Sequence, residues 1–366
     1  MKKWNIGWGA VSKCNMKCQF CYSKFRRQHS KDLGLEDWFS FVDQNHEYIN
    51  TINYGTGENS LSDDWFTLVG YIREKYPNIR QALTTNGYVS EAVRLDAKKE
   101  KIIVDSIDEM DISLDFCDPN KHNDFRGQKH AYRWALDTLE FCRSNGITAT
   151  IVCLGSCQNT DINNIKGIFD IAEKYDVKVR MNLYRPTEGV NEFTSQFILK
   201  PEKLIELLYW VDQNYSILSI SDALFSNLLT DTVEADPSGI DSLRILPNGD
   251  ITPSTYLIHE EFVVGHIKEQ NVLQKLNDEA ILQGIIHDVI PEECNECKYK
   301  NNCKGGVYDR RYLWNNSLSH KDPYCIYTPG EAEFRKITLA QIKFESVHHG
   351  YLPTIFFAPY KKTNES

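Results

Sequence analysis

Short apolar stretches alternate with longer segments of helical periodicity through the first half of the chain. The apolar stretches predict strands over 5–12, 48–54, 79–84, 110–115, 147–154 and 177–183. Apolar residues recur at helical spacing over 63–76, 89–101, 130–145 and 162–175. Strands that alternate with helices of this length predict an α/β fold with a parallel sheet of βα units. The pattern is consistent with an open (β/α)6 partial barrel of the TIM type.

Polar residues and glycines follow several of these strands directly. Ligands in parallel α/β architectures lie at the carboxyl ends of the strands, so these residues are candidates for a binding site. The candidates, in chain order, are Gly57, Glu58, Asn86, Ser113 and Asp115. An ordinary strand-to-helix turn is the alternative explanation for the Gly57-Glu58 pair.

Three cysteines follow the first predicted strand in a C-x3-C-x2-C arrangement: Cys14, Cys18 and Cys21. Three thiolates on one short loop can hold three irons of a [4Fe–4S] cluster and leave the fourth iron open. An open iron binds a small chelating ligand, and S-adenosylmethionine (SAM) offers an amino and a carboxylate group. The alternative is structural zinc, which usually takes four protein ligands, and no fourth cysteine or histidine follows Cys21 closely.

The cysteine spacing, with Phe20 just before the last cysteine, resembles the signature of the radical SAM superfamily. The family usually carries Gly-Gly-Glu-Pro after the second strand, where this chain has Thr56, Gly57, Glu58 and Asn59. The resemblance implies that Gly57 and Glu58 hold the methionine ammonium of SAM, and a carboxylate suits that task.

The same resemblance extends along the later strands. It implies that Phe20 packs beside the adenine, and that Asn86 belongs to the family's third-strand end. Ser113 and Asp115 would bond the ribose hydroxyls or orient their neighbours. Arg126 would reach the methionine carboxylate or an acidic group of the substrate.

A second cysteine group lies near the C-terminus: Cys294, Cys297, Cys303 and Cys325. Four thiolates describe a closed site, either [4Fe–4S] or zinc. The pattern resembles the second auxiliary cluster of a SPASM domain, a cysteine-rich extension of many radical SAM enzymes. Residues 243–253 resemble the β-hairpin that opens this domain, with a strong turn signal at Asn248-Gly249-Asp250.

Two cysteines of a full SPASM domain are missing, since Ser254 and Val307 stand near their positions. We therefore expect two [4Fe–4S] clusters in total, one open and SAM-binding, one auxiliary. The expected domains are a radical SAM core over 1–230, a SPASM-like domain over 231–330, and a C-terminal helix and tail over 331–366. The apolar stretch 348–359 is expected to fold back over a groove.

Four cysteines remain outside these two groups. Cys117 follows the fourth strand, where a thiol would be able to return a hydrogen atom to a substrate radical; simple packing is the alternative. Cys142 lies in a helical pattern and is expected to be buried. Cys153 and Cys157 flank the end of the fifth strand, so one of them is expected to face the cavity.

Composition narrows the class of protein. The 366 residues include 41 Lys and Arg and 51 Asp and Glu, a net charge of −10, which disfavours sequence-independent binding of nucleic acid. No apolar run is long enough to span a membrane, and the N-terminus lacks a secretion signal. Eleven cysteines without such a signal point to metal or redox chemistry in the cytoplasm rather than to disulfides.

The resemblance implies a radical SAM oxidoreductase. An electron donor of the flavodoxin or ferredoxin type would reduce the open cluster, SAM would be cleaved to a 5′-deoxyadenosyl radical, and the radical would abstract hydrogen from a C–H bond. SPASM-like features favour tailoring of a ribosomal peptide by crosslinking, epimerisation or oxidation. The alternative is a small sugar, nucleoside or antibiotic precursor.

Two further expectations concern partners and class. Only thirteen residues precede Cys14, which leaves no room before it for a domain that recognises a leader peptide, so a separate recognition protein is a candidate partner. A non-catalytic zinc or iron–sulfur binding module, or a degenerate scaffold that turns nothing over, are the alternatives of another class.

Overall fold

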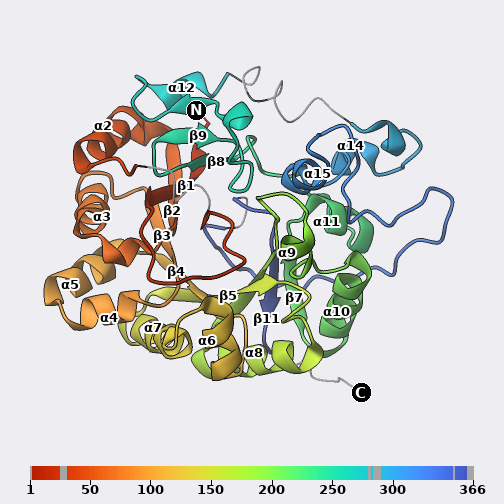
Figure 1. Ribbon diagram of the computed structural model, residues 1–366, viewed down its shortest axis with the longest axis horizontal. Coiled ribbons are helices and arrows are strands. Elements are labelled where there is room, and N and C mark those ends of the chain that lie inside the picture. The colour runs from red at the N-terminus through yellow and green to blue at the C-terminus, as the bar shows by residue number, and fades with distance from the viewer. Residues whose placement is uncertain (1, 25–30, 279–281, 283–289, 349–350, 361–366) are drawn as a thin grey trace.

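The computed structural model describes residues 2–24, 31–278, 282, 290–348 and 351–360. A curved sheet surrounds the centre of the molecule, and most helices lie outside it (Figure 1). The strands are β1 (Trp4–Val11), β2 (Ile49–Thr56), β3 (Arg80–Thr85), β4 (Glu109–Ser113), β5 (Thr148–Gly155), β6 (Lys178–Leu183), β7 (Ser216–Ile220), β8 (Ser242–Ile245), β9 (Asp250–Thr252), β10 (Gly265–His266) and β11 (Ile355–Ala358).

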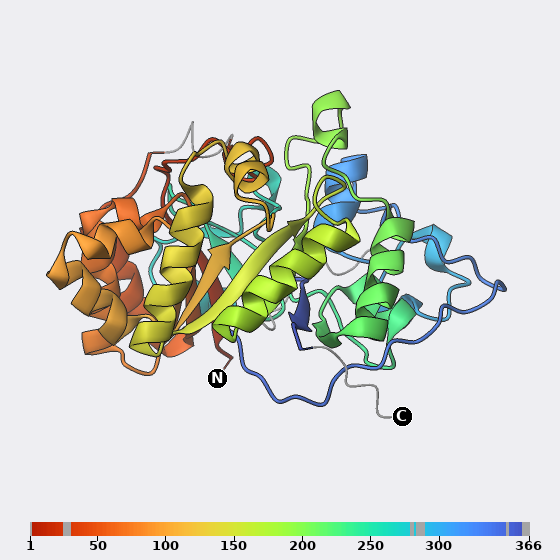
Figure 2. The ribbon, with the colours of Figure 1, turned by 90° about the horizontal axis from the view of Figure 1, so that it is seen from below.

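The helices that cover the sheet mostly follow the strands one by one (Figure 2). They are α2 (Leu35–Asn45), α3 (Asp63–Lys75), α4 (Val89–Arg94), α5 (Ala97–Ser106), α6 (Pro119–Arg126), α7 (Ala131–Asn145), α8 (Ile162–Tyr175), α9 (Glu192–Ser195), α10 (Pro201–Asn214) and α11 (Ala223–Leu229). Three short helices belong to the C-terminal third: α12 (Val272–Lys275), α14 (Lys300–Cys303) and α15 (Tyr308–Asn315). No helix among the described residues is long and apolar enough to cross a membrane.

The sheet confirms the predicted α/β class. Its strand order is β10-β9-β8-β1-β2-β3-β4-β5-β6-β11-β7, and every neighbouring pair from β1 to β6 is parallel. The sheet is open, because β10 and β7 stand at opposite ends of the order. All six predicted strands exist, with ends that differ by a few residues.

Strand β1 shows how the pattern of residues shapes the interior. Trp4, Ile6 and Trp8 are buried, and the Trp8 ring meets Phe41 of α2 edge-on at 5.3 Å, so this face packs under the helices. Gly7 and Gly9 alternate with them and face the inside of the barrel. Because these two positions lack side chains, β1 leaves space at the centre of the sheet.

The single helix predicted over 89–101 is wrong at its middle. The structure has two helices there, α4 and α5, which break at Leu95 and Asp96. The Asp96 carboxylate accepts hydrogen bonds from the backbone N–H groups of Lys98 and Lys99, so it caps a new helix.

The predicted hairpin after residue 243 is confirmed. Strands β8 and β9 pair antiparallel, and β8 also pairs in parallel with β1. The first part of the segment expected to be a separate C-terminal domain therefore continues the central sheet. The cysteine-rich segment follows it, and α14 lies beside α11 (Figure 1).

The helix expected within 331–366 is absent from the described residues 331–348 and 351–360. Instead β11 inserts between β6 and β7 and pairs antiparallel with both. All four of its residues are buried and apolar, and two neighbouring strands satisfy its backbone groups, which favours a strand over a helix. The predicted fold-back of 348–359 thus takes the form of a strand; residues 349–350 lie outside the described part.

Candidate functional site

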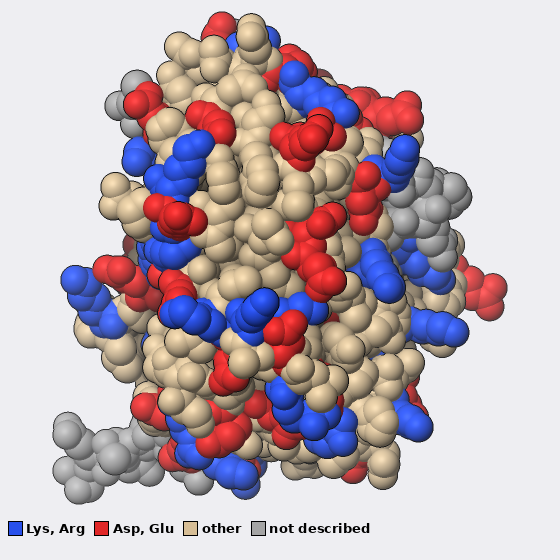
Figure 3. Space-filling view, turned by 90° about the vertical axis from the view of Figure 1, so that its left-hand side faces the viewer, with Lys and Arg blue, Asp and Glu red and all other residues tan. Residues whose placement is uncertain are grey.

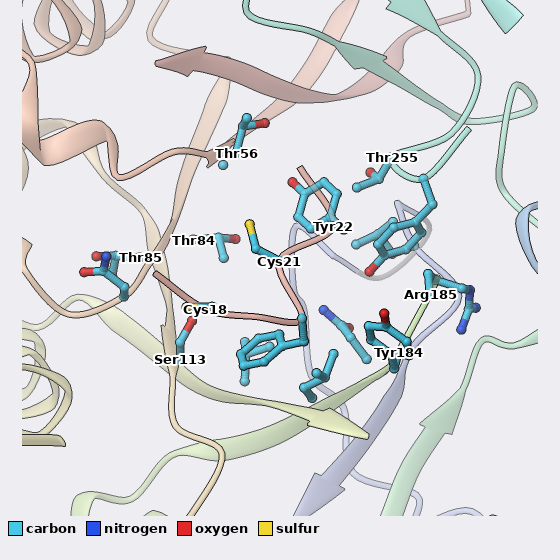
Figure 4. A pocket seen from close by; sticks show the side chains of 18 of the residues that line it. Cys18, Cys21, Tyr22, Thr56, Thr84, Thr85, Ser113, Tyr184, Arg185 and Thr255 are labelled. Atoms are coloured by element: carbon cyan, nitrogen blue, oxygen red, sulfur yellow. The ribbon is translucent and has the colours of Figure 1, made fainter. Parts of the chain in front are cut away.

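A cavity of about 190 Å³ lies inside the sheet, and the cysteine loop after β1 forms part of its wall. Figure 4 shows Cys18 and Cys21 between Thr85 and Ser113 on one side and Tyr184 and Arg185 on the other. The lining residues come from the ends of β2 to β6, from β8 and the segment after β9, and from the C-terminal segment. This is the edge of the sheet where the sequence predicts a site.

The three N-terminal cysteines, Cys14, Cys18 and Cys21, all line this cavity, and none forms a disulfide. Polar groups surround them: the Cys18 thiol lies 3.5 Å from the backbone oxygen of Arg126, and Asn86 Nδ2 lies 3.7 Å from Cys14 Sγ. Three thiols outside any disulfide that face one cavity match the ligand set of a cluster with one open iron. The donor set therefore fits a [4Fe–4S] cluster better than a closed zinc site.

Phe20 also lines the cavity and stacks on Phe125, with ring centroids 4.2 Å apart. The guanidinium of Arg126 lies over the Phe20 ring, 5.1 Å from its centroid. An apolar, aromatic wall is thus present where the sequence predicts an adenine contact.

Gly57 lies where the chain passes closest to the cysteine loop. A Cβ atom at this position would stand 2.4 Å from the backbone oxygens of both Val11 and Lys13. The Gly57 N–H donates to the Val11 oxygen at 2.9 Å, and the Glu58 N–H donates to the Lys13 oxygen at 2.8 Å. Only glycine permits this approach, which fixes the segment before Cys14.

The Glu58 side chain lies among hydrogen-bond donors at the ends of β2 and β3. Its carboxylate is buried and is not part of the cavity lining. It accepts hydrogen bonds from the Ser60 hydroxyl at 2.6 Å, the Thr85 hydroxyl at 3.0 Å and the Asn86 N–H at 2.8 Å. Burial raises the pKa of Glu58 while these bonds lower it. Its donors hold the carboxylate against β3, so Glu58 positions Thr85 and Asn86, which do line the cavity.

Ser113 lines the cavity at the end of β4, whereas Asp115 lies behind it. The Asp115 carboxylate accepts from Arg126 Nε at 2.6 Å and from the Leu154 N–H at 2.9 Å. The Arg126 side chain is 12% exposed, and the Asp115 carboxylate raises its pKa against the effect of desolvation. Of the two predicted roles of Asp115, orienting a neighbour is the one its contacts match.

Cys117 does not line the cavity. A Cβ added to Gly167 of α8 would meet the Cys117 thiol at 2.4 Å, so this thiol packs against a helix outside the barrel. We therefore drop the prediction that Cys117 returns hydrogen to a substrate radical. Cys153 is the thiol of the fifth strand that faces the cavity, as one of the flanking pair was expected to do, while Cys157 is exposed.

The second cysteine group is also brought together. Cys294, Cys297, Cys303 and Cys325 are all free and line one small pocket beside α11. Gly305 and Gly306 follow the third of them with φ of 88° and 100°, a conformation that favours glycine. After these turns the chain reaches Val307, whose N–H donates to the Asp322 carboxylate at 2.9 Å. A four-thiolate donor set fits either a closed cluster or zinc.

Sequence reasoning missed the residues that later elements add to the cavity. They include Arg180, Arg185, Arg244, Thr255, Tyr256, His348 and Tyr351; Tyr22, which directly follows Cys21, was missed as well. His348 lies 2.7 Å from Asp111, whose carboxylate also meets Arg180 at 2.5 Å, so the C-terminal segment is anchored to the barrel interior. The available signal was a charged residue, Arg244, within the apolar run of the predicted hairpin.

The outer surface carries mixed charge on the face formed mainly by the helices at the left of Figure 1. Lysines and arginines are interspersed there with aspartates and glutamates (Figure 3). That face has no continuous basic surface of the kind that nucleic acid requires.

Residues 10–163 match the model of the Radical SAM superfamily. The chain is similar to the mycofactocin maturase MftC of Mycolicibacterium smegmatis, with 22% identity over 331 residues, 88% of this chain and 82% of the relative. It is also similar to the Fe-coproporphyrin III synthase of Methanosarcina barkeri, with 24% identity over 370 residues, 90% of this chain and 89% of the relative.

Among solved structures, the chain resembles Streptococcus suis SuiB bound to its precursor peptide SuiA. The TM-score is 0.70 at 16% identity, over 89% of this chain and 76% of SuiB. At this identity the likeness supports the fold, including its open partial barrel.

Proposed function

This chain is a radical SAM enzyme with a SPASM-like C-terminal region, and we propose that it tailors a peptide in the central cavity. The family binds SAM and a [4Fe–4S] cluster. The observation that carries the proposal is that three cysteines of one loop, none in a disulfide, line one cavity together with residues from the ends of β2, β3 and β4. A non-catalytic module is disfavoured, because the homologues of this family are enzymes.

We assign the following roles to the lining residues. Cys14, Cys18 and Cys21 hold the cluster. The backbone at Gly57 and the amide of Asn86 face the methionine part of SAM. A separate set serves the nucleoside: Ser113 bonds the ribose, Phe20 packs beside the adenine, and Arg126, oriented by Asp115, serves a carboxylate.

With SAM and the reduced cluster bound, the chemistry supplied is cleavage of SAM to methionine and a 5′-deoxyadenosyl radical, which takes a hydrogen atom from a C–H bond. The chain supplies position and exclusion of water. The rings of Phe20, Phe125 and Phe197 pack against one another beside the cysteine loop, which shields this side from solvent. The electron comes from an external donor of the flavodoxin or ferredoxin type.

A peptide substrate is supported by the likeness to SuiB, whose structure holds a precursor peptide. The similarity to an Fe-coproporphyrin III synthase favours the second candidate, a small molecule. A separate recognition protein is a candidate partner only if the substrate is a peptide.

The substrate class is tested with anaerobically reconstituted, dithionite-reduced protein and SAM. Short peptides encoded beside the gene are added in one series, and sugars and nucleosides in another. We expect a peptide to increase 5′-deoxyadenosine formation and to change in mass itself. Stimulation by a small molecule with no response to any peptide would replace peptide tailoring by the second candidate.

We propose that Cys294, Cys297, Cys303 and Cys325 hold an auxiliary [4Fe–4S] cluster within a SPASM-like domain over 231–330. Replacing Cys325 with serine is then expected to lower the iron content from about eight to about four per chain, because one closed cluster loses a ligand. Iron and acid-labile sulfide are measured after reconstitution. The exposed Cys157 provides the control, since Cys157→Ala should keep all the iron. Zinc in this site, or unchanged iron in Cys325→Ser, would contradict the assignment.

Replacing Gly57 with alanine is expected to weaken SAM binding by about tenfold or more. The new methyl group would overlap the backbone oxygens of Val11 and Lys13 and push the cysteine loop away. SAM affinity is measured by equilibrium dialysis. Gly34→Ala is the matched control, because a Cβ at Gly34 meets nothing within 4 Å. Equal affinities in the two variants would mean that the close approach at Gly57 does not shape the SAM site.

A further inference from the structure

Four arginines line the central cavity, and among the described residues that line it there is no lysine, aspartate or glutamate. Three of the four have a buried carboxylate partner behind the wall. These pairs are Arg126–Asp115 at 2.6 Å, Arg180–Asp111 at 2.5 Å and Arg185–Asp309 at 2.5 Å. Arg244 on β8 is the fourth, and no described carboxylate pairs with it.

The surroundings of Arg244 are polar but uncharged. Arg244 is buried, with only 2% of its surface exposed. Its Nη atoms meet the hydroxyls of Tyr351 at 3.4 Å, Tyr22 at 3.3 Å and Thr56, and its Nε–H has no acceptor in the described structure. Tyrosine and threonine hydroxyls are neutral hydrogen-bonding groups, so these contacts do not balance the charge of the guanidinium. A buried cation without a counter-charge is costly, and an anion from outside would relieve that cost.

The fold makes room for this guanidinium. A Cβ at Gly9 would lie 3.1 Å from Arg244 Nη2 and 2.4 Å from the Thr56 hydroxyl oxygen. Thr56 itself has a φ of 90°, a strained conformation for a β-branched residue. The missing side chain at Gly9 on β1 and the strained backbone at Thr56 on β2 both lie beside the Arg244 guanidinium. This coincidence indicates a built site rather than an accidental cavity.

We propose that Arg244 is the docking residue for a carboxylate of the substrate, with the Tyr22 and Tyr351 hydroxyls as further donors. This inference rests on the proposed function, because it names a chemical group of the substrate that the same cavity takes. Guanidinium matches carboxylate in charge and in planar geometry. Tyr22 directly follows Cys21, so a carboxylate bound here lies next to the cysteine loop and places the adjoining carbon atoms beside the reaction centre.

The carboxylate would come from the end of a peptide or from an acidic side chain, and two pairs of probes separate these sources. The first pair is N-acetylglycine and N-acetylglycinamide. The second is the α-amide of N-acetylglutamic acid and that of N-acetylglutamine. Each probe is titrated into the reconstituted enzyme in the presence of SAM, and binding is followed by saturation-transfer NMR. We expect the acid of one pair to bind about tenfold or more tightly than its amide.

Replacing Arg244 with glutamine should abolish this preference for the acid, and Arg244→Lys should keep part of it. SAM affinity should stay the same in both variants. The exposed Arg94 gives the control, and Arg94→Gln should keep the full preference. The thermal midpoint of Arg244→Gln should equal or exceed that of the parent, because a buried charge without a partner has been removed.

Three results would overturn the proposal: no preference for either acid in the parent, a preference that persists in Arg244→Gln, or a loss of SAM affinity in Arg244→Gln. The last would assign Arg244 to the carboxylate of SAM itself. Formation of 5′-deoxyadenosine without substrate is followed in parallel. An acid preference that depends on Arg244 in a protein that never cleaves SAM would sink the proposed function and leave the docking site standing.

Discussion

Replacing Cys21 with alanine reduces the formation of 5′-deoxyadenosine from SAM to background, a loss of about a thousandfold or more. On the proposed assignment, Cys14, Cys18 and Cys21 supply the three thiolates that hold the open cluster, and losing one leaves two. Even partners in the outer shell of a metal site are worth about 10–100-fold, so loss of a direct ligand costs more. The product is measured by chromatography after anaerobic reconstitution and reduction.

The control for this prediction is Cys157→Ala, which removes an exposed thiol outside the cavity. It should retain the parent's rate. The iron content distinguishes loss of the N-terminal cluster alone from loss of both clusters. Cys21→Ala should keep about four irons per chain, those of the second site. Unchanged product from Cys21→Ala would refute the assignment of the cysteine loop.

Replacing Arg310 with methionine is expected to lower the free energy of unfolding by about 3–5 kcal/mol. Arg310 is fully buried on α15 between two carboxylates, at 2.5 Å from Asp222 and 2.6 Å from Asp322. Its guanidinium also lies over the Tyr324 ring at 4.8 Å. The substitution removes the cation that pairs directly with both buried carboxylates, and removing one partner is the costliest way to break such a network.

The pH dependence tests the cause. Burial raises the pKa of Asp222 and Arg310 lowers it, with a net fall, so the network stabilises the parent at neutral pH and loses strength as acid protonates the carboxylate. In Arg310→Met, Asp222 loses the main charge that lowers its pKa, so burial raises this pKa and protonation relieves the buried carboxylate. The difference between parent and variant, measured by denaturant unfolding, should therefore narrow from pH 7 towards about pH 4.

Arg143→Gln is the matched control, because Arg143 is exposed on α7, where it pairs with its helix neighbour Glu140 and lies 5.8 Å from the Tyr175 ring centroid. It should leave the unfolding midpoint unchanged. Asp322 stands three residues before Cys325, so Arg310→Met should also release iron from the second site before the first. A difference that does not vary with pH would mean that lost packing, and not charge, explains the effect.

Much of the fold could be predicted from the sequence, because its signals are local. Alternation of apolar stretches with helical periodicity predicted six strands of the sheet, and the Asn248-Gly249-Asp250 turn predicted the hairpin. The C-terminal segment could not be placed, because β11 depends on a gap between β6 and β7 that no local pattern encodes. The break between α4 and α5 at Asp96 could not be predicted either, because the helical spacing of apolar residues continues across it.

The candidate site divides in the same way. The cysteine loop and Gly57 were found because spacing and motif mark them. The contacts of the Glu58 carboxylate with Thr85 and Asn86 were not predicted, since the sequence does not tell which side of a strand end a carboxylate faces. Arg244 and Tyr351 come from segments far along the chain, and only the curvature of the sheet brings them to the residues after β1. Long-range pairing, rather than residue chemistry, was the missing information.

The central claim is that SAM binds to the open iron of the cluster held by Cys14, Cys18 and Cys21. The most direct test is electron–nuclear double resonance of the reduced protein with SAM that carries 15N in its amino group. We predict a nitrogen coupling in the parent that persists in Cys325→Ser and disappears in Cys21→Ala. A parent protein with both clusters reduced and no coupling would contradict the account.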